Sequence, residues 1–118
     1  MSPNSNGRTP VPLNPGPDES RRQLAAALAL AEYIVSEAPV LPASVTLHQP
    51  FGLPGEIDVD VMAATVDDVT TLQRFLGGEL TVTPHADGRL FTEARGCAMG
   101  AAFRVWRLGP ATPKAVAA

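Results

Sequence analysis

The sequence predicts an α+β fold of two layers: an antiparallel sheet of four to five strands with two helices on one face, in the order α-β-β-α-β-β-β. Residues 18–37 and 67–76 carry apolar side chains at helical spacing, whereas five shorter segments alternate apolar and polar residues as strands do. Each element then has one apolar side, and packing helices on a sheet buries both. We expect a single domain over residues 18–108.

Proline is concentrated near the ends of the chain. Residues 1–17 contain five prolines and no periodic apolar pattern. Proline fixes φ and removes a backbone donor, so this segment is expected to be a disordered or polyproline-like tail. Residues 109–118 hold two prolines and four alanines and predict a second, flexible tail.

The first helix is expected to begin between Asp18 and Ser20 and to end at about Glu37. Ser20 and Gln23 form a capping box, and Pro39 disfavours helical backbone in the residue before it. One side of this helix is broad and apolar, which suits a helix that lies on a sheet. The alanines on that side allow close approach to the sheet or to a second copy of the helix. That side comprises a stripe of Leu24, Leu28, Ala31 and Val35, widened by Ala27, Leu30 and Ile34.

Two strands, at 44–49 and 56–63, are expected next and most simply pair as a hairpin around the loop 50–55, which is rich in proline and glycine. The second strand alternates strictly, so one of its faces is apolar and the other acidic. Three carboxylates on an outer face are usually solvated or paired, and we expect arginines of the later strands to pair with them rather than a metal ion to bind. The acidic face is Glu56, Asp58 and Asp60, and the arginines are Arg89, Arg95 and Arg104.

The second helix is expected to begin with Asp67 as its N-cap and to end at Gly77-Gly78. Three strands follow, at 80–85, 89–97 and 102–108, with turns at Asp87-Gly88 and near Met99-Gly100. Gly96 predicts a bulge or the end of regular pairing in the middle one of these strands.

Some of these features resemble a type of small, uncharacterised actinobacterial protein. Those proteins have an Ala/Leu-rich first helix, a valine-alternating hairpin, a second helix that ends in Leu-Gly, and a late Gly…Val-x-Val-Trp strand. The corresponding residues here are Leu76-Gly77-Gly78, Gly96 and Arg104-Val105-Trp106, with Phe103 in place of the first valine of the late motif. The resemblance covers residues from about 20 to 108. It implies a bacterial cytoplasmic setting, in the neighbourhood of mobile or phage-like genes, and it supplies no function.

Residues that carry chemistry are sparse. Cys97 is the single cysteine, which excludes an intrachain disulfide and a zinc site built of several cysteines. It lies in Arg-Gly-Cys-Ala-Met-Gly, without the pattern of a nucleophile or a phosphate loop, and neither His48 nor His85 has an identifiable acid partner. We therefore predict no catalytic, cofactor-binding or metal-binding residues, and an enzyme is the least favoured reading.

The candidate interaction surface consists of Phe91, Arg95, Arg104 and Trp106 on the last two strands. Alternation places Phe91 and Arg95 on one face of their strand, and Arg104 and Trp106 on one face of the next. Aromatic and arginine side chains displayed together stack on bases or anchor protein partners. Burial of Trp106 beneath a helix or a tail is an equally open alternative.

The favoured function is that of a non-enzymatic, cytoplasmic protein-interaction module. Self-association to a homo-oligomer is expected, through the sheet face or the alanine-rich first helix. Residues 1–79 carry ten acidic and four basic side chains and residues 80–118 carry two and five, an asymmetry that can guide self-association. The alternative is a nucleic-acid-binding accessory protein that uses a basic surface of Arg89, Arg95, Arg104 and Trp106.

The cellular compartment follows from weaker signals. One unpaired cysteine suits a reducing cytoplasm. Arg21-Arg22 followed by an apolar run resembles a twin-arginine export signal, but Glu32 interrupts the run and the amphipathic pattern continues beyond it. No segment reaches the roughly 18–20 apolar residues of a membrane-spanning helix, so we expect no membrane partner.

Overall fold

The computed structural model describes residues 17–49 and 57–109, and their elements follow the predicted order. The elements are α2 (Pro17–Glu37), β1 (Ser44–His48), β2 (Asp58–Met62), α3 (Val66–Leu76), β3 (Glu79–Pro84), β4 (Leu90–Ala98) and β5 (Ala101–Leu108). Most of the expectations for residues 1–17, and those for the loop 50–55, Glu56 and the tail from residue 110, lie outside the described residues.

The five strands form one sheet in the order β1-β2-β5-β4-β3. β1 and β2 pair as the expected hairpin, and β3, β4 and β5 form an antiparallel meander. The expectation of a wholly antiparallel sheet is wrong at one pair, because β2 and β5 run parallel. The cause is α3, which carries the chain from β2 to the far edge of the sheet. The meander then returns, and its last strand inserts beside β2.

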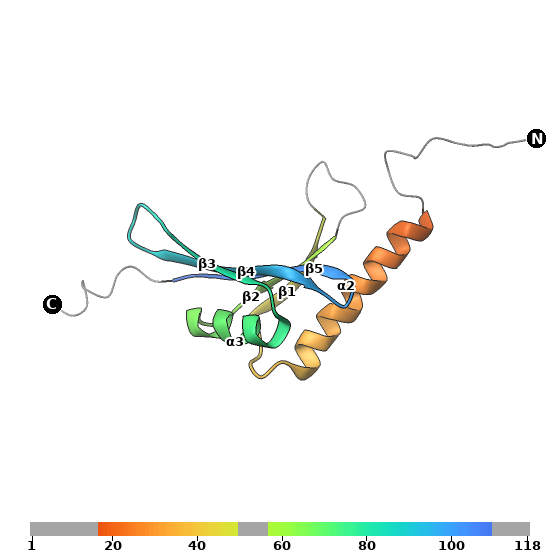
Figure 1. The fold of residues 1–118 in the computed structure, drawn as a ribbon, viewed down its shortest axis with the longest axis horizontal. Helices are drawn as coiled ribbons and strands as arrows, with labels where there is room; N and C mark the ends of the chain where they lie inside the picture. The colour runs from red at the N-terminus through yellow and green to blue at the C-terminus, as the bar shows by residue number, and fades with distance from the viewer. Residues whose placement is uncertain (1–16, 50–56, 110–118) are drawn as a thin grey trace, which may run out of the picture.

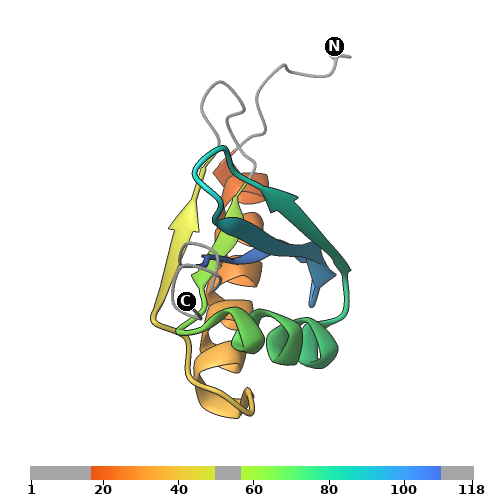
Figure 2. The same cartoon turned by 90° about the vertical axis from the view of Figure 1, so that its left-hand side faces the viewer.

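Both helices pack on the same face of the sheet, which makes the predicted two layers (Figure 1). α2 lies against β1, β2 and β5, and α3 lies against β3, β4 and β5. Tyr33 of α2 stacks on Phe75 of α3, with ring centroids 5.0 Å apart, and so ties the two helices together. Figure 2 shows β1 and β3 as the two edges of the twisted sheet. The opposite face carries no helix among the described residues and is called the open face below.

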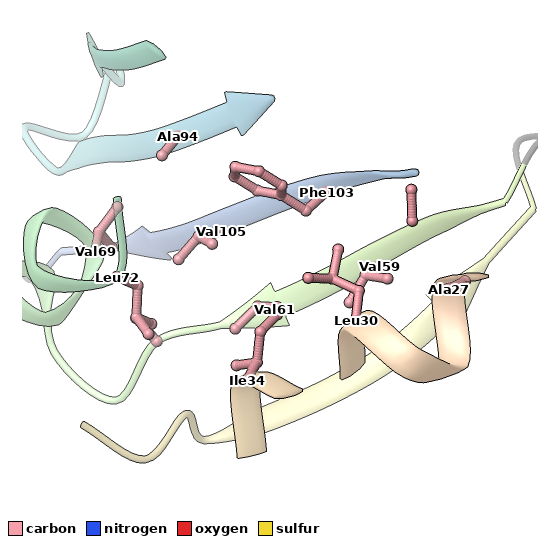
Figure 3. Close-up of a cluster of buried hydrophobic side chains, with 12 residues drawn as sticks. Ala27, Leu30, Ile34, Val59, Val61, Val69, Leu72, Ala94, Phe103 and Val105 are labelled. Carbon is pink, nitrogen blue, oxygen red and sulfur yellow. The ribbon is translucent and has the colours of Figure 1, made fainter. Parts of the chain in front are cut away.

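The core lies between the two layers (Figure 3). Its largest fully buried side chains are Leu30 and Ile34 from α2, Val69 and Leu72 from α3, and Val59, Val61 and Val105 from the sheet. The stripe predicted to be the centre of the buried side of α2 is wrong: Leu24, Leu28 and Val35 are exposed, and Ala27, Leu30 and Ile34 face the sheet instead. The apolar arc of α2 is wider than the strip of helix surface that a sheet can cover, and the sequence does not show which part of the arc is covered.

Two local expectations at the ends of elements are also wrong. Thr65, rather than Asp67, is the N-cap of α3, and its side-chain oxygen accepts a 3.1 Å hydrogen bond from the backbone N–H of Asp68. Gly96 is in regular register with Phe103, without a bulge. It is glycine because a Cβ there would lie 2.9 Å from the Cα of Gly78, so its absent side chain is needed for close packing rather than for a turn.

Candidate interaction surface

Alternation along the three central strands places a mixed set of side chains on the open face. The residues that alternate with them along each strand point to the helices, as the burial of Val59, Val61, Ala94, Phe103 and Val105 shows. The open face carries Asp58, Asp60 and Met62 from β2, Ala102, Arg104 and Trp106 from β5, and Phe91, Glu93, Arg95 and Cys97 from β4.

Arg104 lies at the centre of this surface. Its Cζ atom is 5.5 Å from the ring centroid of Phe91 and 5.6 Å from that of Trp106, so one guanidinium covers both rings. The two rings are themselves stacked, with centroids 6.0 Å apart. Arg104 Nε also donates to Oε2 of Glu93, whose side chain is only 16% exposed. One carboxylate thus holds a partly buried cation over two aromatic rings.

Trp106 is half-buried on the open face, so it does not lie beneath either helix. Its indole Nε1 donates a 2.8 Å hydrogen bond to Oδ1 of Asp60 on the neighbouring strand. A buried indole usually needs such a partner for its N–H, and here the partner also fixes the orientation of the ring. One side of the aromatic pair is therefore presented in a defined position.

The three arginines pair with carboxylates other than the predicted ones on β2. Arg95 Nε lies 3.8 Å from Oε2 of Glu93, and Arg89 makes a 2.7 Å contact with Asp87 within the β3–β4 turn. The expected pairing of these arginines, and of Arg104, with the acidic face of β2 is wrong for Asp58 and Asp60. Glu93 lies two residues before Arg95 on β4 and diagonally across from Arg104 on β5, and its carboxylate contacts both arginines.

The structure brings together three of the four predicted surface residues and places the fourth at their rim. Phe91, Arg104 and Trp106 form one cluster, while Arg95 is 66% exposed beside it. Sequence reasoning missed Glu93 and Asp60 as the carboxylates that position Arg104 and Trp106. Their alternation was visible in the sequence, but the parallel β2–β5 pair that brings Asp60 to Trp106 was not.

The charge of the open face is slightly acidic. Among the described strand residues it carries four carboxylates against two arginines, which gives −2. The carboxylates are Asp58, Asp60, Glu79 and Glu93, and the arginines are Arg95 and Arg104.

No group of three or more metal-ligating side chains gathers within residues 17–49 and 57–109. A cavity of about 200 Å³ lies beside the start of β2, lined by Gln23, Ile57, Asp58, Gly100, Ala101 and Ala102. It is smaller than the roughly 300–1,000 Å³ of common ligand pockets. Asp58 is the one carboxylate in its lining, which contains no serine, threonine, cysteine, histidine or lysine.

Within the described part of the chain, no helix is both long enough and apolar enough to cross a membrane. Comparison with known proteins adds no family or function: no protein-family model, curated protein or solved structure matches this chain.

Proposed function

We propose that the protein is a non-enzymatic, cytoplasmic protein-interaction module that self-associates and binds a protein partner on its open face. The observation that carries this proposal is the stack of Arg104 on Phe91 and Trp106. Tryptophan and arginine are the residues most enriched among those that dominate binding energy at protein interfaces.

The cluster is also preorganised, which supports a role in binding. Asp60 holds the indole of Trp106 and Glu93 holds the guanidinium of Arg104, so neither side chain loses much rotamer freedom when a partner covers it. Arg95 and the remaining carboxylates supply the polar rim that interfaces place around an apolar centre.

The single cysteine allows a direct test of the open face. Cys97 is exposed there, two residues beyond Arg95 on β4, so a photo-crosslinking reagent attached to its thiol samples what binds on the open face next to Arg95. We expect, in an extract of the source cells, an adduct of one defined mass that Arg95→Glu strongly reduces. The control is Cys97→Ala combined with Val82→Cys, which moves the reagent to an exposed position on the helix side of β3.

The outcome separates specific binding from general stickiness. An adduct that forms from Cys97 and not from position 82 supports the open face as the binding surface. The same adducts from both positions, or none from Cys97, would contradict it.

Nucleic-acid binding by the basic surface stays a prediction. No contact of the described residues favours it, since Arg89, Arg95 and Arg104 each face a carboxylate and the open face has a charge of −2. Binding to random DNA that weakens steeply with salt and is lost in Arg104→Glu, with the fold intact, would restore this alternative.

A further inference from the structure

One flank of α2 is apolar and exposed. Leu24, Leu28 and Val35 all point to solvent, and their spacing of four and seven residues places them on one side of the helix. Tyr33, which stacks on α3, lies on the other flank. The apolar flank therefore faces away from α3 and toward the edge of the sheet formed by β1, which α2 contacts (Figure 2).

β1 is an edge strand without the usual protection against pairing. It reads Ser-Val-Thr-Leu-His, with no proline, lysine or acidic residue. Natural edge strands commonly carry charges or proline to prevent association, and β3 at the other edge carries both Glu79 and Pro84. On the helix side of β1, Val45 and Leu47 are only half-buried, so the apolar band of the α2 flank continues onto this edge.

We propose that a second copy of the chain binds here, with the two β1 strands paired antiparallel across a two-fold axis and the two α2 flanks facing each other. This inference rests on the self-association in the proposed function and names its surface. A strand related to itself by a two-fold axis perpendicular to the sheet pairs antiparallel, so the edge is self-complementary. β1 is short, and the apolar flank supplies the buried area that five residues of strand cannot.

The charges of α2 favour the same arrangement. Arg21 and Glu32 lie eleven residues apart, about three helical turns, and therefore on the same side of α2, next to the apolar flank. An antiparallel pair of helices brings Arg21 of each copy toward Glu32 of the other, whereas a parallel pair would bring like charges together. Arg21 contacts Asp18 at 3.2 Å, but both side chains are highly exposed, so this contact is weak and easily exchanged.

The dimer has a consequence for partner binding. The axis runs perpendicular to the sheet, so the two copies form one continuous sheet of ten strands, five from each, with both open faces on the same side. The clusters around Trp106 stay uncovered. The dimer then presents two copies of the candidate interaction surface side by side, which raises the avidity for a partner with two binding sites.

The test compares two variants of equal exposure in the full chain. Leu28 and Val82 are both 53% exposed, the first on the proposed interface and the second on the helix side of β3. By light scattering we expect the unaltered protein and Val82→Glu to be dimers and Leu28→Glu to be a monomer. Thr46→Lys, which adds a charge at the middle of the β1 edge, should also dissociate the dimer. Circular dichroism checks that each variant is folded.

The emission of Trp106 distinguishes the possible failures. If the dimer forms through β1 and α2, the emission maximum is unchanged between monomer and dimer. A dimer that resists Leu28→Glu and shifts the emission of Trp106 to shorter wavelength would overturn this inference while leaving self-association in place. A protein that stays monomeric at every concentration would overturn both, and binding on the open face would then be judged by the crosslink from Cys97 alone.

Discussion

The indole of Trp106 is hydrogen-bonded to the carboxylate of Asp60 across the parallel pair of β2 and β5, with Nε1 and Oδ1 2.8 Å apart. Asp60 of the acidic face of β2 therefore has a structural role, because its hydrogen bond fixes the orientation of the Trp106 ring. The guanidinium of Arg104 lies over the same ring, and Glu93 holds it there.

The bond between Asp60 and Trp106 can be tested by a conservative pair of substitutions. Asp60→Ala leaves the half-buried N–H without its acceptor and should lower the free energy of unfolding by about 1–2 kcal/mol. Asp60→Asn keeps a side-chain oxygen at this place and should lose less. Urea unfolding followed by Trp106 emission measures both, and equal losses in the two variants would argue against the bond.

Substitutions at two adjacent positions of β2 should change stability by very different amounts. Val59 is fully buried, and Val59→Asp should unfold the domain, because an unpaired buried charge costs several kcal/mol of a total stability of about 5–15 kcal/mol. Asp58 makes no contact with a charged or hydrogen-bonding partner among the described residues, so Asp58→Asn should change stability by less than about 0.5 kcal/mol. Thermal unfolding by circular dichroism compares them. A strong loss of stability in Asp58→Asn would show that its carboxylate has a role that the fold does not explain.

The two glycines after α3 differ in what surrounds them. Both have positive φ, +88° at Gly77 and +94° at Gly78, so alanine at either position strains the backbone by about 1–3 kcal/mol. At Gly78 the added Cβ would also lie 2.6 Å from the carbonyl oxygen of Arg95, whereas at Gly77 it would meet nothing within 4 Å. Denaturant unfolding should therefore show a clearly larger loss for Gly78→Ala than for Gly77→Ala. Equal losses would mean that the strand after α3 moves to relieve the contact.

The turn between β3 and β4 gives a pH-dependent signal. The side-chain hydrogen bond from Arg89, aided by the backbone N–H of Arg89, holds the pKa of Asp87 below its ordinary value of 3.8. Because the folded-state pKa is lowered, the small stabilisation is present above pH 3.8 and is lost as the pH falls through the lowered pKa. A carboxyl ¹³C titration by NMR should find this low midpoint, and Arg89→Ala should return it toward 3.8. An unchanged midpoint in that variant would remove Arg89 as the cause.

The order of elements was predictable because each has a strong local signal. The alternation of Val59 and Val61, the Asp87-Gly88 turn and Pro39 all act over a few residues, and the corresponding strands, turn and helix end appear where expected. The pairing of β5 with β2 was not predictable in this way, because nothing local in either strand specifies a neighbour more than forty residues away. The pairing depends on α3 crossing the sheet.

The candidate surface was predictable in its residues and not in its contacts. Strand alternation placed Phe91 on one face of its strand and Arg104 with Trp106 on one face of the next. Whether these faces coincide, and which carboxylate each polar group contacts, depends on the register between strands. The apolar arc of α2 shows the same limit. Its composition predicts a helix on a sheet, and packing alone decides that Leu28 remains exposed while Leu30 is buried.

The oligomeric state is the most direct test of whether the protein is a self-associating interaction module. Sedimentation equilibrium of the intact chain, up to roughly 100 micromolar so that a dimer of micromolar Kd is largely formed, measures it. We expect a mass that rises from 12.3 kDa toward twice that value, about 24.6 kDa, and that stays at 12.3 kDa in Leu28→Glu. A mass of 12.3 kDa for the unaltered protein over the whole range would contradict self-association.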